Sequence, residues 1–171
     1  MGGCALIAYG TNLYIFGGYS INTIIKYDTL TQTETTLDQT LLLEQCLDMA
    51  PVIWKDKILL IGGHNNSGIY YNTFYCFDPI NETVTLLDTQ LPQGGCKDLE
   101  AVVVNDAIYI IGGDYAGTSS NLILEYSNFT TEPTNMRYQQ LTYGDASFNP
   151  YFEDTGLVLD ELADEDMSGG M

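Results

Sequence analysis

The residues of this chain that are best suited to bind or to react lie beside three pairs of glycines, at positions 17–18, 62–63 and 112–113. The only histidine of the sequence, His64, directly follows the second pair. The candidates are polar or aromatic residues just after a glycine pair or in the segment before the next repeat: Tyr19, Asp48, His64, Asn65, Asn66, Asp98, Asp114 and Tyr115. Tyrosine and asparagine supply contact area and adaptable hydrogen bonds, so this set predicts a ligand-binding surface.

Six residues in the same segments belong to types that bind metal ions: Cys46, Asp48, His64, Cys96, Asp98 and Asp114. Zinc accepts cysteine and histidine, whereas calcium requires oxygen ligands. Each cysteine stands sixteen residues before the first glycine of a pair, so the two are equivalent positions of neighbouring repeats. Such a register does not aim the side chains at one point, and the sequence has no CxxC pair. We therefore predict no metal and no cofactor.

Catalytic chemistry has weaker support than binding. No nucleophile-elbow pattern surrounds a serine. A single histidine is more often a surface or packing residue than a general base. The sequence therefore predicts no catalytic residue and a chain that is not an enzyme.

The charge of the chain restricts its partners. There are 23 acidic and 5 basic residues, for a net charge of -18. Such a surface repels phosphate backbones and anionic lipids, so we expect neither nucleic acid nor membrane as a partner. No apolar run is long enough to span a bilayer, and the start lacks the layout of a secretory signal. These features favour a cytoplasmic protein with reduced thiols.

Each glycine pair closes a repeated pattern of short apolar runs. In the second copy, residues 49–54 and 57–61 are apolar and are separated by Lys55-Asp56, which predicts a hairpin. A third strand, residues 71–78, ends in Phe77-Asp78, as residues 23–28 end in Tyr27-Asp28. Residues 28–38 then align without gaps on residues 78–88, which predicts a fourth strand. Four short antiparallel strands in about 45–50 residues are typical of a propeller blade.

With these features the chain resembles the kelch family of β-propellers over about residues 4–134. The residues that carry the resemblance, and that we expect to be structural, are Gly17, Gly18, Gly62, Gly63, Gly112, Gly113, Tyr27, Asp28, Phe77 and Asp78. A kelch unit usually has a tryptophan in strand four, where this chain has Glu34, Val84 and Pro133. The resemblance implies an all-β fold, an array of three four-stranded antiparallel blades that forms a partial β-propeller.

We predict three parts of the chain. The boundaries are 1–134 for three blades (about 1–45, 46–95 and 96–134), 135–152 for an irregular capping segment and 153–171 for an acidic tail. Pro133 cannot donate to a strand ladder, which marks the third blade as unfinished. Residues 153–171 are rich in Asp and Glu without a base, so we expect disorder there, with a short docking motif as the alternative.

Three blades form an open arc, whereas propellers usually have four to eight. An open arc leaves an apolar flank at each end, so we expect a ring shared between subunits, completion by another chain, or a fragment of a longer propeller. The resemblance also implies that the loops after the glycine pairs bind partner proteins. We therefore predict a non-catalytic protein–protein interaction module whose partner is another protein or a second copy of itself. The alternatives are a carbohydrate-binding or adhesion module of a secreted or virion assembly, with a glycan as ligand, and a kelch-type enzyme.

Overall fold

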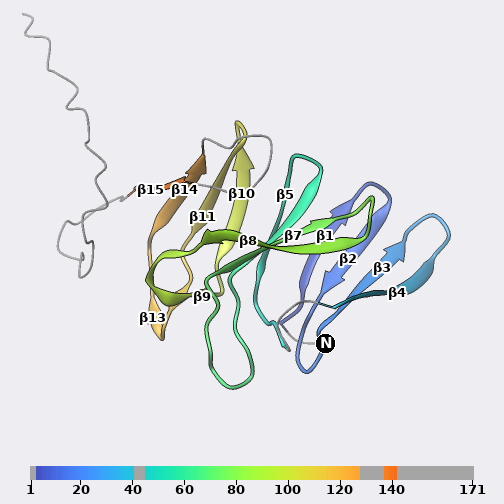
Figure 1. Cartoon of the computed structure of the whole chain (residues 1–171), viewed down its shortest axis with the longest axis horizontal. Coiled ribbons are helices and arrows are strands. Elements are labelled where there is room, and N and C mark those ends of the chain that lie inside the picture. Colours follow the sequence, from blue (N-terminus) through green and yellow to red (C-terminus); the bar gives the residue numbers. More distant parts are fainter. Residues whose placement is uncertain (1–2, 41–44, 128–136, 142–171) are drawn as a thin grey trace, which may run out of the picture.

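A computed structural model describes residues 3–40, 45–127 and 137–141. Three four-stranded antiparallel sheets stand side by side along the molecule (Figure 1), and in each the strands pair in the order of the chain. Blade 1 contains β1 (Ala5–Tyr9), β2 (Asn12–Phe16), β3 (Thr23–Asp28) and β4 (Thr33–Thr40). Blade 2 contains β5 (Ala50–Trp54), β6 (Lys57–Ile61), β7 (Thr73–Asp78) and β8 (Thr83–Gln90). Blade 3 contains β10 (Glu100–Val104), β11 (Ala107–Ile111), β14 (Ile123–Ser127) and β15 (Arg137–Leu141).

A small three-stranded sheet is added beside blade 3. It consists of β9 (Cys96–Lys97), β12 (Asp114–Tyr115) and β13 (Thr118–Ser119), with β12 in the middle. The only helical segment in the described ranges is η1 (Pro92–Gly94), a single 3-10 turn. Within the same ranges no helix is long and apolar enough to cross a bilayer.

The hairpins of blades 2 and 3 form where the sequence predicts them. Lys55 and Asp56 have φ of 45° and 62°, and Asn105 and Asp106 have φ of 50° and 63°. Two successive residues with positive φ give the two-residue turn whose twist matches that of the flanking strands. The strands on both sides therefore pair directly, with Trp54 opposite Lys57 and Val104 opposite Ala107.

An aspartate folds the turn after the third strand of blades 1 and 2. Asp28 Oδ1 accepts hydrogen bonds from the backbone N–H groups of Leu30 and Thr31, at 2.8 and 3.2 Å. Asp78 Oδ1 does the same for Ile80 and Asn81, at 2.9 and 3.3 Å. The backbone hydrogen bonds lower the pKa of Asp28. An aspartate side chain that bonds the backbone two residues further on is a turn former, which explains why this residue recurs.

The core consists of two layers, each between neighbouring blades. Residues of β6 alternate between the layers, so that Ile58 and Leu60 face blade 1, while Leu59 and Ile61 face blade 3. All four are 0 % exposed. A strand covered on both faces reads as a continuous apolar run, which is why β6 shows no polar alternation.

Aromatic side chains link the sheets across both layers. The ring of Phe77 lies 5.2 Å from that of Tyr14 in blade 1. In the other layer the rings of Phe74 and Tyr126 are 5.1 Å apart. Trp54 also donates its Nε1–H to the backbone oxygen of Asp106, at 2.9 Å. Such contacts each add to the area burial and fix the spacing of the blades.

The expectation of an irregular segment over 135–152 is wrong for residues 137–141, which form β15 and complete blade 3. The kelch resemblance implied strand four of the third blade at Pro133, by comparison with Glu34 and Val84 in the first two blades. The connection between β14 and β15 spans residues 128–136, whereas residues 29–32 connect β3 to β4, so the strand lies later in the sequence. Pro133, residues 142–152 and the acidic tail at 153–171 lie outside the described residues.

Candidate functional site

The glycine pairs are corners where two blades meet. Gly17 and Gly62 have φ of +61° and +66°, and a Cβ on either would lie 2.4 Å from a backbone oxygen, that of Cys46 or Cys96. Only glycine permits an approach this close. In these two pairs the second glycine, Gly18 or Gly63, donates its N–H to the same oxygen, at 3.0 and 2.7 Å. The segment that leads into each blade is thereby docked on the corner of the preceding blade.

We call these segments, residues 45–49 and 95–99, linkers 2 and 3. Leu47 of linker 2 and His64 exchange two backbone hydrogen bonds, at 2.9 and 3.0 Å. In blade 3 the equivalent pair is Lys97 and Asp114, which belong to β9 and β12. The linkers and the loops after the glycine pairs therefore lie on one end of the blades, which we call the loop face.

A broad hollow of about 660 Å³ opens on the loop face between blades 1 and 2. Its volume is within the range of ligand sites in proteins. The residues that line it come from linker 2, from both post-glycine loops and from the start of the chain: Gly3, Tyr19, Ile21, Leu47, Asp48, His64 and Asn66. Tyr19 is 65 % exposed, so its ring is available to a ligand.

His64 and Asp48 form the polar wall of this hollow. His64 Nε2 lies 3.0 Å from Asp48 Oδ2, and Nδ1 lies 2.8 Å from the backbone oxygen of Asn65. A carbonyl oxygen and a carboxylate only accept hydrogen bonds, so in both contacts the ring nitrogen is the possible donor. The two contacts fix the orientation of the ring and hold the Asp48 carboxylate at the edge of the hollow.

The backbone conformation at position 48 also favours an aspartate. Its φ is +54°, and Asp98 at the same place in linker 3 has φ of +55°. Aspartate and asparagine tolerate this left-handed conformation better than most residues. Part of the recurrence of aspartate in the linkers is therefore structural.

A second polar cluster lies on the loop face between blades 2 and 3. Tyr70 donates its hydroxyl to Asp114 Oδ2 at 2.9 Å, and Lys97 Nζ lies 3.3 Å from Asp98 and 3.9 Å from Asp114. The hydrogen bond to Asp114, and then burial, raise the pKa of Tyr70, and Asp98 raises the pKa of Lys97. The other oxygen of Asp114 is buried without a hydrogen-bond partner in the described part of the chain. This cluster links the loop that contains Tyr70 to linker 3 and β12.

Residues 45–88, which span linker 2 and blade 2, match the family model described as the Kelch motif. The fold matches 149 chains of solved structures. One of them is the structure of YjhT, with a TM-score of 0.71 and 16 % sequence identity over 84 % of this chain. Linker 2 and blade 2 thus carry a kelch motif, and the fold of the chain is that of a partial propeller. The predicted array of four-stranded kelch blades is thus confirmed.

The chain is shorter than the similar solved structure. The match covers 52 % of YjhT, so the chain spans about half the length of that structure. No curated protein sequence matches the chain.

The kelch loop face gathers four of the predicted binding residues around the hollow: Tyr19, Asp48, His64 and Asn66. Asn65 instead shapes the loop, since its Oδ1 accepts from the backbone N–H groups of Ser67 and Ile69 at 3.0 and 2.9 Å. Asp98 and Asp114 belong to the second cluster, away from the hollow.

Tyr115 does not contribute to the binding surface as expected. Its side chain is 6 % exposed and is part of the apolar layer between blades 2 and 3. The reason is that β12 pairs with β9, so that Asp114 and Tyr115 point to opposite sides of this ribbon.

The six residues of metal-binding types do not meet at one point. In the described ranges no three His, Cys, Asp or Glu side chains are close enough to hold a metal ion. Burial raises the pKa of Cys46 and that of Cys96 to about 12, so both remain thiols. Cys46 Sγ faces the backbone oxygen of Gly62 at 3.9 Å, and Cys96 Sγ faces that of Gly112 at 4.0 Å. These cysteines recur because a small thiol fits under the glycine corner.

Sequence reasoning did not select three residues of these sites. Ile21 and Leu47 line the hollow, and Tyr70 belongs to the second cluster. The third strand of blade 2 was expected to begin at residue 71, directly after Tyr70, but β7 begins at Thr73. The loop after Gly63 is thus long enough to return Tyr70 to the loop face. A signal existed in Gly68, which indicates a turn within this segment.

Proposed function

We propose that this kelch array is a non-catalytic interaction module, and that its loop face binds a segment of another protein in the hollow between blades 1 and 2. The observation that carries the proposal is the make-up of the hollow, which combines an exposed tyrosine ring, apolar Ile21 and Leu47, and a carboxylate fixed by His64. An apolar floor with a few oriented polar groups is the usual composition of a binding site.

The charges favour a segment that carries lysine or arginine. The Asp48 side chain is 33 % exposed beside the hollow, and the chain as a whole has a net charge of -18. A cationic side chain in the hollow would be attracted by Asp48 and by the face of the Tyr19 ring. The overall negative potential would also speed the association of a cationic partner.

The environments of the reactive groups support binding rather than catalysis. Both ring nitrogens of His64 already have partners, so neither is directed at a nucleophile. Cys46 and Cys96 remain protonated because burial raises their pKa, and a thiol is a poor nucleophile compared with a thiolate.

A peptide array that samples Lys and Arg in varied apolar contexts tests the proposal, followed by titration calorimetry of the hits. We expect Asp48→Asn and Tyr19→Ala each to weaken binding about tenfold, and added salt to weaken it further. Asparagine also tolerates the positive φ at position 48, so Asp48→Asn keeps the linker in place. Leu30→Ala is the control, since Leu30 is 77 % exposed on the turn after β3, outside the hollow.

Peptide affinity that neither substitution changes would contradict the placement of the site. A glycan array with the same variants examines the carbohydrate alternative. If the chain bound a glycan through Tyr19 and Asp48 and bound no peptide, the ligand of the hollow would be a carbohydrate and not a protein.

A further inference from the structure

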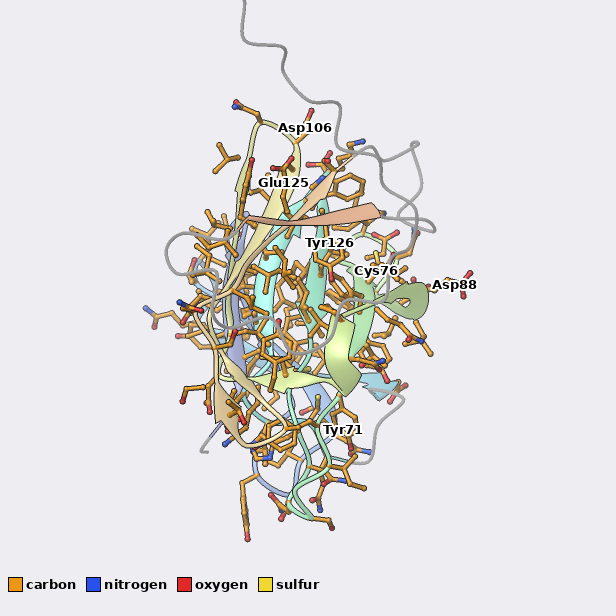
Figure 2. All side chains as sticks on the ribbon, turned by 90° about the vertical axis from the view of Figure 1, so that its left-hand side faces the viewer. Tyr71, Cys76, Asp88, Asp106, Glu125 and Tyr126 are labelled. Carbon is orange, nitrogen blue, oxygen red and sulfur yellow. The ribbon has the colours of Figure 1, made fainter. Side chains whose placement is uncertain are left out.

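The face of blade 3 that points away from blade 2 carries exposed apolar side chains next to two carboxylates, those of Glu100 and Glu125. Figure 2 looks at the molecule from this end, where β14 carries Glu125. Along β10 and β11, side chains alternate between this end and the layer that contacts blade 2. The outward residues Val102, Val104 and Ile111 are 46 %, 47 % and 45 % exposed. We call this surface the C-flank.

Blade 2 has the same surface, but there it is covered. The positions fifty residues earlier, which pair in the same register, are Val52, Trp54 and Ile61. They are 6 %, 2 % and 0 % exposed because blade 3 packs on them. At these three positions the C-flank therefore has the residue types that a further blade covers in this array, while Glu100 and Glu125 stand where blade 2 has Ala50 and Cys76.

The glycine corner of blade 3 leads to the same conclusion from the backbone. Gly112 has φ of +68°, like Gly17 and Gly62. The nearest atom to a Cβ on Gly112 is the backbone oxygen of Ser120 at 3.6 Å, whereas the first two corners meet a linker oxygen at 2.4 Å. Among the described residues, no linker is docked on this third corner. Its geometry matches that of the two corners that hold one.

The opposite end of the array offers the matching surface, which we call the N-flank. On β1 and β2 it includes Leu6, 56 % exposed, and the partly buried Leu13 and Ile15. The equivalents of Leu13 and Ile15 in blade 2 are Ile58 and Leu60, which are 0 % exposed because they pack on blade 1. The N-flank thus has the residue types that cover a C-flank-like surface elsewhere in the chain.

We propose that the C-flank of one copy packs on the N-flank of a second copy, and the reverse, so that two chains close a ring of six blades. The ring contains twice as many blades as one chain. This number agrees with the length of the YjhT structure, of which this chain spans about half. Each flank is then covered by the flank of the other copy, in the way that the equivalent faces of neighbouring blades cover each other inside one chain.

The charges at the new junction are compatible with this ring, despite the net charge of each copy. Inside the chain, Lys26 of blade 1 contacts Glu82 of blade 2, with 2.8 Å between Nζ and Oε1. By register, Glu125 takes the place of Lys26 in blade 3, and Gln32 takes the place of Glu82 in blade 1. At the junction between copies a carboxylate would therefore meet a neutral amide that can donate to it. At this pair of positions two like charges would not face each other.

A tyrosine of the N-flank supplies a further specific contact. Tyr126 of blade 3 donates its hydroxyl to the backbone oxygen of Gln90, at the end of blade 2's last strand, at 3.2 Å. Tyr27 occupies the same place in blade 1, since it pairs with Leu13 as Tyr126 pairs with Ile108. In the ring, the Tyr27 hydroxyl would meet the end of β15 of the other copy.

Sedimentation equilibrium of the full chain tests the ring. We expect a species of twice the mass of one chain at micromolar concentration. Gly112→Ala places a methyl group on the corner that the second copy would approach, where the two equivalent corners meet a backbone oxygen at 2.4 Å, and the ring contains this corner twice. We therefore expect the dissociation constant to rise about 100-fold or more. Gly117→Ala is the control, because its φ is also positive, at +89°, and a Cβ there meets no atom within 4 Å.

A pair of charge variants distinguishes the ring from any other dimer. Leu6→Asp on the N-flank and Val102→Lys on the C-flank should each give monomers, because β1 of one copy meets β10 of the other. The first strands of neighbouring blades contact each other within the chain in the same way. An equimolar mixture of the two variants should form a heterodimer, since one junction then carries opposite charges and the other is unchanged.

Several outcomes would overturn the proposal. A folded wild-type monomer at 100 μM would show that other residues, such as 142–171 or another protein, cover the flanks. A dimer that resists Gly112→Ala, or a mixture of the charge variants that stays monomeric, would show that copies associate through a different surface. Emission of the buried Trp54 confirms in every case that the variant is folded.

Discussion

The glycine corners make a quantitative prediction about how neighbouring blades hold each other. Gly17 and Gly10 lie in blade 1 and have almost the same backbone conformation, with φ of +61° and +60°. A Cβ on Gly10 meets nothing within 4 Å, whereas a Cβ on Gly17 lies 2.4 Å from the backbone oxygen of Cys46. Alanine at the two positions therefore imposes the same conformational strain, but only Gly17→Ala disturbs the junction with blade 2.

The expected magnitudes follow from this difference. A left-handed conformation costs an alanine about 1–2 kcal/mol, so Gly10→Ala should lower the free energy of unfolding by about that amount. Gly17→Ala adds the overlap with a backbone atom, which cannot rotate away as a flexible side chain can. Overpacking of this kind typically costs about 1–3 kcal/mol. The shift of linker 2 also weakens the 3.0 Å hydrogen bond from Gly18 to Cys46.

Urea denaturation followed by the emission of Trp54, which is 2 % exposed in the fold, measures both variants. With a slope of about 2 kcal/mol per molar urea, the midpoint of Gly17→Ala should lie roughly 1 M below that of Gly10→Ala. Equal midpoints would refute the reasoning, because they would mean that the junction adjusts to a methyl group without loss. Gly17→Ser, which adds a still larger group, should lie below both.

Two titrating pairs give further predictions. Burial raises the pKa of Cys46 and that of Cys96 to about 12. The two protonated thiols therefore add their full contribution to the free energy of unfolding below about pH 8.5, and this contribution is lost as the pH rises towards 12. Alkylation of both at pH 8, read by mass spectrometry, should occur only as fast as the fold opens, and rapid labelling would contradict their burial. The hydrogen bond from Lys57 lowers the pKa of Asp78, so its stabilising effect is complete above about pH 4 and is lost at lower pH. Lys57→Met should cost about 1 kcal/mol at pH 7 and much less at pH 2 in denaturant titrations, and a pH-independent loss would assign the effect to packing.

Much of the fold could be predicted because its cause is local in the sequence. Lys55-Asp56 defines a two-residue turn, and that turn fixes the register of β5 and β6. The glycine pairs could be recognised as corners because no other residue allows the approach of Cys46 or Cys96 to the backbone. The linkers and the post-glycine loops lie on one face because successive strands of each blade run in opposite directions.

The parts that could not be predicted depend on lengths and on non-local pairing. The position of β15 depends on the connection of residues 128–136, whose length no repeat of the pattern indicates. The burial of Tyr115 depends on β12 pairing with β9, two short segments whose sequences have no alternation. The different surroundings of the equivalent Asp48 and Asp98 depend on non-local contacts, since Asp48 meets His64 at the hollow while Asp98 meets Lys97.

The enclosure of β6 between two apolar layers has a consequence for how the molecule opens. In an array where each unit touches only its neighbours, stability is close to a sum of unit and junction terms. The outer blades have one junction each inside the chain and blade 2 has two, so fluctuations that expose amides should begin at the ends. The amides of Ile58 to Ile61 should then exchange with solvent deuterium only when the whole chain unfolds, and their exchange rate reports its global free energy.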